Sequence, residues 1–251
     1  MDRTFGSVGK GVAVRIEDEM AEVRLDRPEK LNALDFEMFG HIAGCIQWLK
    51  GEEALRCVVL SGEGRSFCAG LDLSVLETGL GPLSPRSHGI ANLPQFCAWG
   101  WRELPVPVIA AINGHCFGAG IQIALGADIR IAAPDAHLSI MEMRHGLVPD
   151  MGAYALARGV IREDIMRELV YTARRVPGEE AQGLGLITRI ADDPLAAAIE
   201  LAREIAGQSP AGIRAAKRLF RQMAEGDAAT ILQAESDEEE PLVTALRGPR
   251  H

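Results

Sequence analysis

Two short stretches rich in small residues could present main-chain amide groups to a ligand. In the first, residues 108–112 are apolar and predict a buried strand, Asn113-Gly114 predicts a turn, and Gly118 begins a segment typical of an apolar helix. The amide of Ala119 would then lie at the positive end of the helix dipole, with little side-chain bulk around it. Such an amide could form one half of an oxyanion hole.

The spacing of the glycines in this stretch bears on several roles that they could have. They could serve only the close packing of a strand against a helix. A dinucleotide fingerprint would need a third glycine shortly after Gly120, where Ile121-Gln122-Ile123 stands instead. A Walker loop would need Gly-Lys-Ser/Thr, and the stretch has none. Close packing and ligand binding both stay open for this stretch taken alone.

A second stretch repeats the pattern about fifty residues earlier. Residues 56–61 predict a buried strand, residues 62–66 a loop, and residues 67–76 a small-residue turn that leads into a short helix. The amide of Leu71 follows directly after Gly70 in this turn. Two such units can face one carbonyl oxygen from two sides, as an oxyanion hole requires.

These motifs together resemble those of the crotonase (enoyl-CoA hydratase/isomerase) superfamily. The resemblance extends over residues 12–158 and a tail segment at 209–217, and it is carried by residues 27–34, 67–73 and 111–120. It implies an α/β fold with a spiral core of repeated β-β-α units over residues 1–193. It also implies a C-terminal helical appendage over residues 194–251 that mediates assembly into homo-oligomers, namely a trimer or a dimer of trimers.

The resemblance further implies that the substrate is carried as a coenzyme A thioester, with no prosthetic group. The amides of Leu71 and Ala119 would stabilise the thioester enolate, and losing one such donor typically costs about 2.7 to 4 kcal/mol. Lys30 and Arg27 are chemically suited to phosphate groups. The residues expected to contact coenzyme A are Arg27, Lys30, Asn32, Ala33, Ala69, Gly70, Leu71, Asp72, Leu73 and Ser74.

The residues available as acid and base bear on whether the chain catalyses hydration or isomerisation. Hydratases of the superfamily use two glutamates, whereas this chain has Gln122 at the position matching the first and Glu142 at the second. An amide cannot accept a proton near neutral pH, although it can hydrogen-bond water. We therefore favour double-bond isomerisation over hydration, and keep as an alternative an enoyl-CoA hydratase in which Gln122 orients the water.

Asp150 lies eight residues beyond Glu142, a spacing that resembles the dienoyl-CoA isomerases of the superfamily. Those enzymes pass a proton along the acyl chain between two acids, so Glu142 is expected to act as base and Asp150 as second acid or base. They also have a third acid where Gln122 stands. Asp150 follows Pro149 and could instead cap a helix.

An alternative to an enzyme is a protein that binds acyl-CoA with little turnover.

The resemblance to the superfamily is less clear in two regions of the chain. Residues 77–103 carry Phe96, Trp99 and Trp101, which could border the acyl pocket or belong to the core. Related chains commonly have an aromatic residue followed by Lys or Arg near the C-terminus that reach a neighbour's nucleotide, whereas this chain has Thr244-Ala245-Leu246-Arg247 there. Contacts between this tail and the coenzyme A of another subunit are therefore in doubt.

Composition narrows the possible classes of protein. A net charge of −9 argues against a nucleic-acid surface, and no apolar run reaches the length of a membrane span. Five irregularly spaced cysteines without a C-x-x-C pair predict reduced core residues, and the first residues lack a signal-peptide pattern, so we expect a cytoplasmic protein. The histidines are not spaced as metal ligands. A Ser-His-Asp hydrolase is not favoured, because the two turns carry Cys68 and Cys116.

The elements that must position these residues follow from periodicity. Residues 12–16 and 21–25 alternate apolar and polar positions and predict an antiparallel hairpin. Asp35 is placed to cap a helix whose apolar face starts at Phe36, and residues 154–169 predict a further helix. Asp193-Pro194 begins the first of three helices in the appendage, and an acidic run at residues 237–240 predicts a solvated tail.

Overall fold

A mixed sheet forms the centre of the molecule. The computed structural model describes residues 3–4, 11–79, 83–224 and 226–247, and over these it contains a seven-stranded sheet of order β1-β2-β3-β4-β5-β7-β10 and a three-stranded sheet of order β6-β8-β9. The strands are β1 (Arg3–Thr4), β2 (Val12–Glu17), β3 (Met20–Leu25), β4 (Cys57–Gly62), β5 (Val108–Ile112), β6 (His115–Phe117), β7 (Ile129–Ala132), β8 (His137–Ser139), β9 (Val176–Pro177) and β10 (Arg189–Ile190). The expected α/β class is confirmed.

Strand register brings the loops of interest to one edge of the large sheet. The predicted hairpin is present as β2 and β3, which pair antiparallel. From β3 onward the strands β4, β5, β7 and β10 are parallel, so their carboxyl ends meet at the same edge. Every residue of β5 is buried, as its continuous apolar sequence predicts for a central parallel strand.

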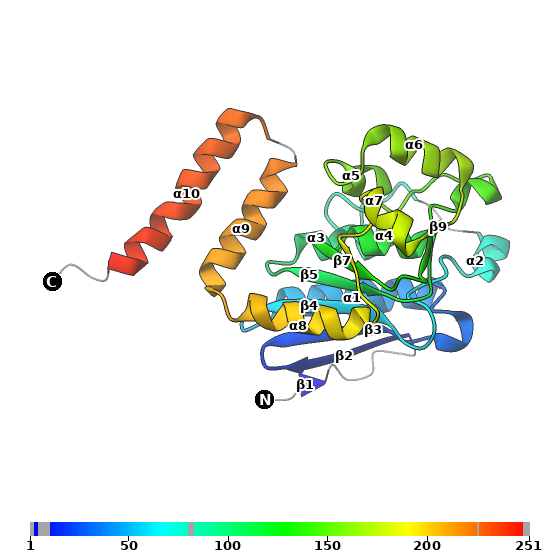
Figure 1. Cartoon of the computed structure of the whole chain (residues 1–251), viewed down its shortest axis with the longest axis horizontal. Helices are drawn as coiled ribbons and strands as arrows, with labels where there is room; N and C mark the ends of the chain where they lie inside the picture. Colours follow the sequence, from blue (N-terminus) through cyan, green and yellow to red (C-terminus); the bar gives the residue numbers. More distant parts are fainter. Residues whose placement is uncertain (1–2, 5–10, 80–82, 225, 248–251) are drawn as a thin grey trace.

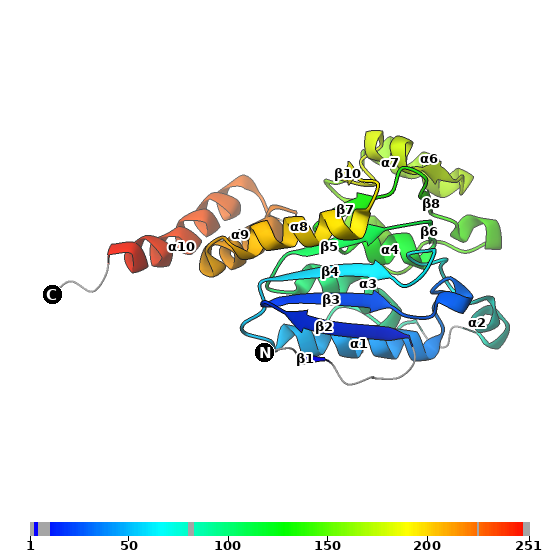
Figure 2. The same ribbon diagram turned by 60° about the horizontal axis from the view of Figure 1, so that its bottom comes forward.

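Helices cover both faces of this sheet. The helices of the described residues are α1 (Phe36–Lys50), α2 (Leu73–Thr78), α3 (Leu93–Glu103), α4 (Ala119–Leu125), α5 (Ala153–Ala157), α6 (Glu163–Thr172), α7 (Gly178–Gly183), α8 (Pro194–Ala206), α9 (Pro210–Met223) and α10 (Ala228–Arg247), with 3-10 turns η1 (Pro28–Lys30) and η2 (Glu142–His145). Alternate residues of β4 face opposite sides: Val58 and Leu60 join the main core with α1, α3 and α4, whereas Cys57 and Val59 pack against α8. Figures 1 and 2 show α1 and α8 on opposite faces.

Helix α1 begins where its cap predicts. The Asp35 side chain accepts a hydrogen bond of 2.9 Å from the Met38 amide, and Phe39 and Ile42 lie on the buried face of the helix. Phe36, the first helical residue, is 46% exposed rather than part of that face.

Two local predictions differ from the structure. A short strand, β6, separates the Asn113-Gly114 turn from α4, because residues 115–117 pair with β8. The single helix expected over residues 154–169 is divided into α5 and α6. Arg158 leaves the helical conformation and Gly159 is left-handed (φ 74°), which ends α5 before α6 begins at Glu163.

The three helices expected beyond residue 193 are present as α8, α9 and α10. The cap at Asp193 is present, with a hydrogen bond of 2.9 Å from the Ala196 amide, but α8 packs on β4, β5 and β7 and completes the core. Of the described helices, α9 and α10 extend away from the sheets, as an antiparallel pair (Figures 1 and 2). The acidic run at residues 237–240 lies within α10 rather than in a loose tail, and Glu238 forms an ion pair with Arg218.

All five cysteines are buried and free of disulfides, as expected for core residues. Within the described ranges, no helix combines the length and apolarity needed to cross a bilayer. Over the same ranges, no group of three or more His, Cys, Asp or Glu side chains is arranged to hold a metal ion.

Candidate active site

One cavity of about 670 Å³ collects most of the candidate residues at the carboxyl edge of the sheet. Its wall is largely apolar, and its polar side chains belong to Lys30, Asp72, Glu142, His145 and Asp150. The remaining lining residues are Ala33, Phe39, Ala69, Gly70, Leu71, Leu73, Leu83, Pro94, Gly118, Ala119, Met141, Leu147, Val148 and Met151. A cavity of this size and character is typical of a site for a small organic ligand.

The two glycine-containing turns lie against one another beside this cavity. The Phe117 amide donates a hydrogen bond of 3.0 Å to the Cys68 carbonyl, and the Cys68 amide donates one of 2.9 Å to the His115 carbonyl. Leu71 and Ala119 both line the cavity. Among the described residues, neither of their amides donates a backbone or side-chain hydrogen bond. The structure thus brings together two amides that a ligand oxygen could use.

Close approach, rather than ligand access alone, explains two of the glycines. Gly70 has φ of 102°, and a Cβ there would lie 2.9 Å from the Phe117 carbonyl oxygen and 3.7 Å from the Ala119 nitrogen. A Cβ at Gly120 would lie 2.5 Å from the Cys68 carbonyl oxygen. The packing and ligand interpretations of these glycines are therefore compatible, because the absence of side chains allows the two amides to lie near each other.

Glu142 begins the 3-10 turn η2 and faces the cavity from the side of α4. Its Oε1 accepts a hydrogen bond of 2.6 Å from Gln122 Nε2, while its Oε2 is buried and has no hydrogen-bond partner among the described residues. Burial is the main cause that raises the pKa of Glu142, and the nearby Asp150 carboxyl raises it further, against the effect of the Gln122 hydrogen bond. An unpartnered carboxylate oxygen in an apolar cavity can accept a proton from a bound molecule.

Asp150 lines the same cavity, and burial raises its pKa as well. It does not cap the helix that follows, because the N-cap of α5 is Gly152 and no side chain caps that helix. The helix-cap alternative for Asp150 is therefore wrong. Its carboxyl group and that of Glu142 share an apolar cavity in which both are more easily protonated than in water.

Gln122 lies on α4, is 1% exposed, and makes contacts in two directions. Besides its bond to Glu142, its Oε1 accepts hydrogen bonds from the amides of Met151 (2.8 Å) and Ala153 (3.3 Å). Its carbonyl oxygen is thus engaged by main-chain donors. The hydratase alternative expects Gln122 to orient a water molecule. In the structure, its amide oxygen and nitrogen are hydrogen-bonded to protein groups instead.

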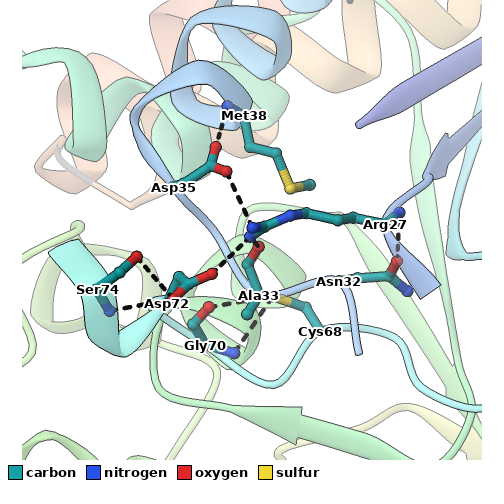
Figure 3. Close-up of polar contacts among 9 residues, drawn as sticks. All are labelled: Arg27, Asn32, Ala33, Asp35, Met38, Cys68, Gly70, Asp72 and Ser74. Carbon is teal, nitrogen blue, oxygen red and sulfur yellow. Dashed lines mark hydrogen bonds and ion pairs between the residues drawn. The ribbon is translucent and has the colours of Figure 1, made fainter. Parts of the chain in front are cut away.

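Arg27 lies in the turn between β3 and α1, where it has a structural role (Figure 3). Its Nη1 donates to the Ala33 carbonyl (2.9 Å) and to Asp72 Oδ2 (2.8 Å), and its Nη2 lies 3.3 Å from Asp35 Oδ2. Both terminal nitrogens are occupied by protein groups rather than offered to a phosphate. Hydrogen bonds from the Ser74 amide and hydroxyl, followed by Arg27, lower the pKa of Asp72 to about 2.

Asn32 and Ser74 also differ from the ligand contacts expected of them. Asn32 is fully buried; its Oδ1 accepts from the Arg27 amide (2.8 Å) and its Nδ2 donates to the carbonyls of Glu63 (3.0 Å) and Ser66 (2.7 Å). The Ser74 hydroxyl donates to Asp72 Oδ1 (2.9 Å). These side chains hold the turn that carries Leu71. Of the residues expected to contact coenzyme A, those that line the cavity are Lys30, Ala33, Ala69, Gly70, Leu71, Asp72 and Leu73.

The aromatic residues of segment 77–103 belong to the core or the surface and not to the cavity wall. Phe96 and Trp101 are buried in the main core, and Trp99 is partly buried with its Nε1 bonded to Glu103. Leu83 and Pro94 of the same segment line the cavity instead. His145 was not among the expected site residues; its place at the end of η2, three residues after Glu142, is the signal that could have found it.

Comparisons with known proteins show a family and several relatives to which the chain is similar. A family model described as enoyl-CoA hydratase/isomerase matches residues 15–244. The chain is 32% identical over 213 residues to Delta(3,5)-Delta(2,4)-dienoyl-CoA isomerase, mitochondrial, of Homo sapiens, covering 78% of this chain and 63% of that relative. It thus spans less than two thirds of that protein. It is also 32% identical over 227 residues to 1,2-epoxyphenylacetyl-CoA isomerase of Escherichia coli (strain K12), covering 88% and 86%.

A solved structure supports the same likeness in three dimensions. A candidate enoyl-CoA hydratase of Thermobifida fusca YX, solved in complex with CoA, superposes with a TM-score of 0.84 and 31% identity. The superposition covers 95% of each chain. The spiral α/β core and the C-terminal helical region expected from the sequence are confirmed by this likeness.

Proposed function

Since the chain belongs to the enoyl-CoA hydratase/isomerase family, we propose that it moves a double bond along the acyl chain of an enoyl- or dienoyl-CoA thioester. The observation that carries this proposal is the pairing of Glu142 and Asp150 in one apolar cavity, with the amide of Gln122 bonded directly to Glu142. Such a site offers two carboxyl groups for proton transfer, and the group hydrogen-bonded to Glu142 is an amide, which cannot accept a proton from water near neutral pH.

The proposed reaction begins with the thioester carbonyl oxygen between the amides of Leu71 and Ala119. The ionised Glu142 takes a proton from the carbon next to the carbonyl, and the electrons of that C–H bond move to the carbonyl oxygen, which the two amides stabilise as an enolate. Protonated Asp150 then gives its proton to the far end of the conjugated system as the enolate electrons return. Exchange of protons with water restores both carboxyl groups, so no atom is gained or lost.

Two features of the site support this division of roles. The Oε2 of Glu142 has no hydrogen-bond partner among the described residues, so no protein donor competes with the first proton for this atom. The raised pKa of Asp150, caused by burial, favours the protonated form that a proton donor needs. The apolar wall formed by residues such as Leu147, Val148 and Met151 suits a hydrocarbon chain, which offers no hydrogen bonds.

The coenzyme A portion would enter past Lys30. Lys30 lines the cavity and, among the described residues, has no hydrogen bond or ion pair through its side chain, whereas Arg27 is fully engaged. We assign Lys30, and not Arg27, as the residue that attracts a phosphate of the thioester.

Assembly into oligomers is proposed from the paired helices α9 and α10. Phe220, Met223 and Leu232 are each at least 60% exposed on these helices, which project away from the sheets (Figure 1). An apolar surface on a projecting helix pair is typical of a subunit contact. Light scattering on the purified chain would test this, since a monomer at every concentration would contradict it.

The decisive experiment offers purified protein 2-enoyl-, 3-enoyl- and 3,5-dienoyl-CoA thioesters in D₂O. We expect a 3-enoyl or 3,5-dienoyl substrate to become its conjugated isomer with deuterium incorporated, and Glu142→Gln to abolish this. Addition of water to the 2-enoyl substrate at a rate independent of Glu142 would contradict the proposal. Binding of the thioesters without turnover would instead favour a carrier role.

A further inference from the structure

The side chain of Gln122 can adopt only one orientation in its surroundings. Two main-chain donors, the amides of Met151 and Ala153, lie 2.8 Å and 3.3 Å from one of its terminal atoms, which must therefore be the carbonyl oxygen. Its NH₂ group is then turned toward Glu142 Oε1, 2.6 Å away. The direction of all three hydrogen bonds follows from the two amides.

These contacts join the two parts of the chain that carry the carboxyl groups. Met151 follows Asp150 directly, and Ala153 is the first residue of α5, whose N-terminus has no side-chain cap of its own. The Gln122 carbonyl thus receives the amides at the start of α5, while its NH₂ group holds Glu142. Because Gln122 is 1% exposed and belongs to the buried helix α4, it provides a rigid support for both.

We propose that Gln122 is a positioning residue that holds Glu142 and the Asp150 segment at a fixed separation and stabilises the proton-accepting form of Glu142 by donating a hydrogen bond to its Oε1. It does not exchange protons itself. This inference rests on the proposed function and deepens it, since it explains why an uncharged amide stands beside the proposed base.

The charge of the neighbouring groups explains why an amide is suited to this place. The titratable and charged groups that line the cavity together with Glu142 are Asp150, His145, Lys30 and Asp72. Glutamate at position 122 could still accept hydrogen bonds from the two main-chain amides, but its second oxygen would lie against Glu142 Oε1. Two carboxylates in such contact cannot both remain ionised and would share a proton. A glutamine donates a hydrogen bond there without adding negative charge.

Two variants separate the parts of this role. Gln122→Glu has nearly the same shape and retains the main-chain contacts, whereas Gln122→Met removes every hydrogen bond and stays compatible with an apolar surrounding. The midpoint of Glu142 titration can be followed by carbon NMR of labelled glutamate carboxyl groups, with Glu142→Gln used to assign the signal. This readout does not require turnover.

We expect Gln122→Glu to raise the Glu142 midpoint by more than about one pH unit and to move the acidic limb of the rate profile by the same amount. We expect Gln122→Met to raise the midpoint and to lower kcat by about ten-fold or more, because the Asp150 segment loses its support. Unchanged midpoints in both folded variants would overturn the inference.

The outcomes distinguish this inference from the proposed function. If the wild-type chain isomerises none of the thioesters but the Glu142 midpoint shifts in both variants, the positioning role stands and the proposed reaction fails. If the wild type isomerises a thioester but the midpoint and rate profile of Gln122→Met match those of the wild type, the reaction stands and the positioning role fails. Circular dichroism of each variant confirms that it is folded before either conclusion is drawn.

Discussion

Lys217 of α9 forms an ion pair with Asp128, the residue that precedes β7, while only 4% of Lys217 is exposed to solvent. The same Asp128 oxygen accepts a hydrogen bond of 2.7 Å from the Val108 amide at the start of β5. One carboxylate therefore joins the helix pair α9 and α10 to two neighbouring strands of the core. Burial lowers the pKa of Lys217, so its charge depends on this partner.

Removing the carboxylate should cost more stability than removing the amine. Asp128→Ala leaves Lys217 buried without its partner and should lower the free energy of unfolding by about 3–5 kcal/mol. Lys217→Met should cost less, since Asp128 is 30% exposed and keeps the Val108 amide. Urea denaturation at a fixed protein concentration measures both. Equal losses in the two variants would contradict the proposed asymmetry.

The turn that carries Leu71 should depend on Gly70. Gly70→Ala meets both a left-handed backbone and the Phe117 carbonyl, and it should lower kcat by about 10²-fold or more through displacement of the Leu71 amide. Gly40→Ala is a matched control, because Gly40 is an exposed residue of α1 with open space around its Cα. The control should be neutral or stabilising by up to about 1 kcal/mol. A Gly70 variant with wild-type kinetics would argue against the role of this turn.

Asp150→Asn should separate catalysis from stability. A lost proton donor should slow isomerisation by about 10²- to 10⁴-fold. The melting temperature should not fall, because Asp150 caps no helix. Asp193→Ala provides the opposite control: it removes the cap of α8 and should cost about 1 kcal/mol without affecting the rate per folded enzyme. A lower melting temperature with unchanged kcat for Asp150→Asn would reverse the assignment.

Glu142→Gln should inactivate the enzyme while stabilising its fold. The pKa of Glu142 is raised by burial, so the folded state holds its proton more strongly than the unfolded state does. The stability that this group contributes is present at low pH and is lost as pH rises through its folded pKa. The neutral variant should therefore gain up to about 2 kcal/mol near pH 7 and lose that advantage in acid. Thermal unfolding across pH 4–8 tests the sign of this difference.

Arg27 and Lys30 should respond differently to truncation, although both are basic residues of one turn. Arg27→Ala breaks contacts with Asp72, Asp35 and the Ala33 carbonyl, so we expect lower stability and a lower kcat. Lys30→Ala should raise KM for coenzyme A thioesters, with thermal stability unchanged. Similar KM effects in both variants, with equal stability, would mean that Arg27 also contacts the ligand.

Patterns that depend on neighbouring residues predicted the local elements well. The β2-β3 hairpin and the cap and proline at the start of α8 follow from alternation and from short-range hydrogen bonding. The split between α5 and α6 was missed, since Gly159 within an apolar pattern can be accommodated in a helix or can end it. Strand β6 was missed because three residues are too few for periodicity, and it exists through pairing with β8.

The candidate site shows the same limit. The two amide-bearing turns could be located because their small residues are consecutive in the chain. Whether Arg27 faces a phosphate or Asp72 depends on a contact across 45 positions, which residue types alone do not determine. Asn32 was likewise expected to contact the ligand, but it is buried and its Nδ2 donates a hydrogen bond to the Ser66 carbonyl. Residues at such turns can be recognised as important without their partners being known.

The main-chain amides of Ala119 and Leu71 belong to segments that differ in how deeply they are buried. Ala119 lies shortly after the short strand β6 and begins a helix whose residues are all buried, whereas Leu71 is followed by Leu73, which is 62% exposed at the start of the short helix α2. Local opening requires less free energy where few apolar contacts are lost. Adjustment of the protein to a bound thioester should therefore occur on the Leu71 side, with Ala119 as the stationary reference.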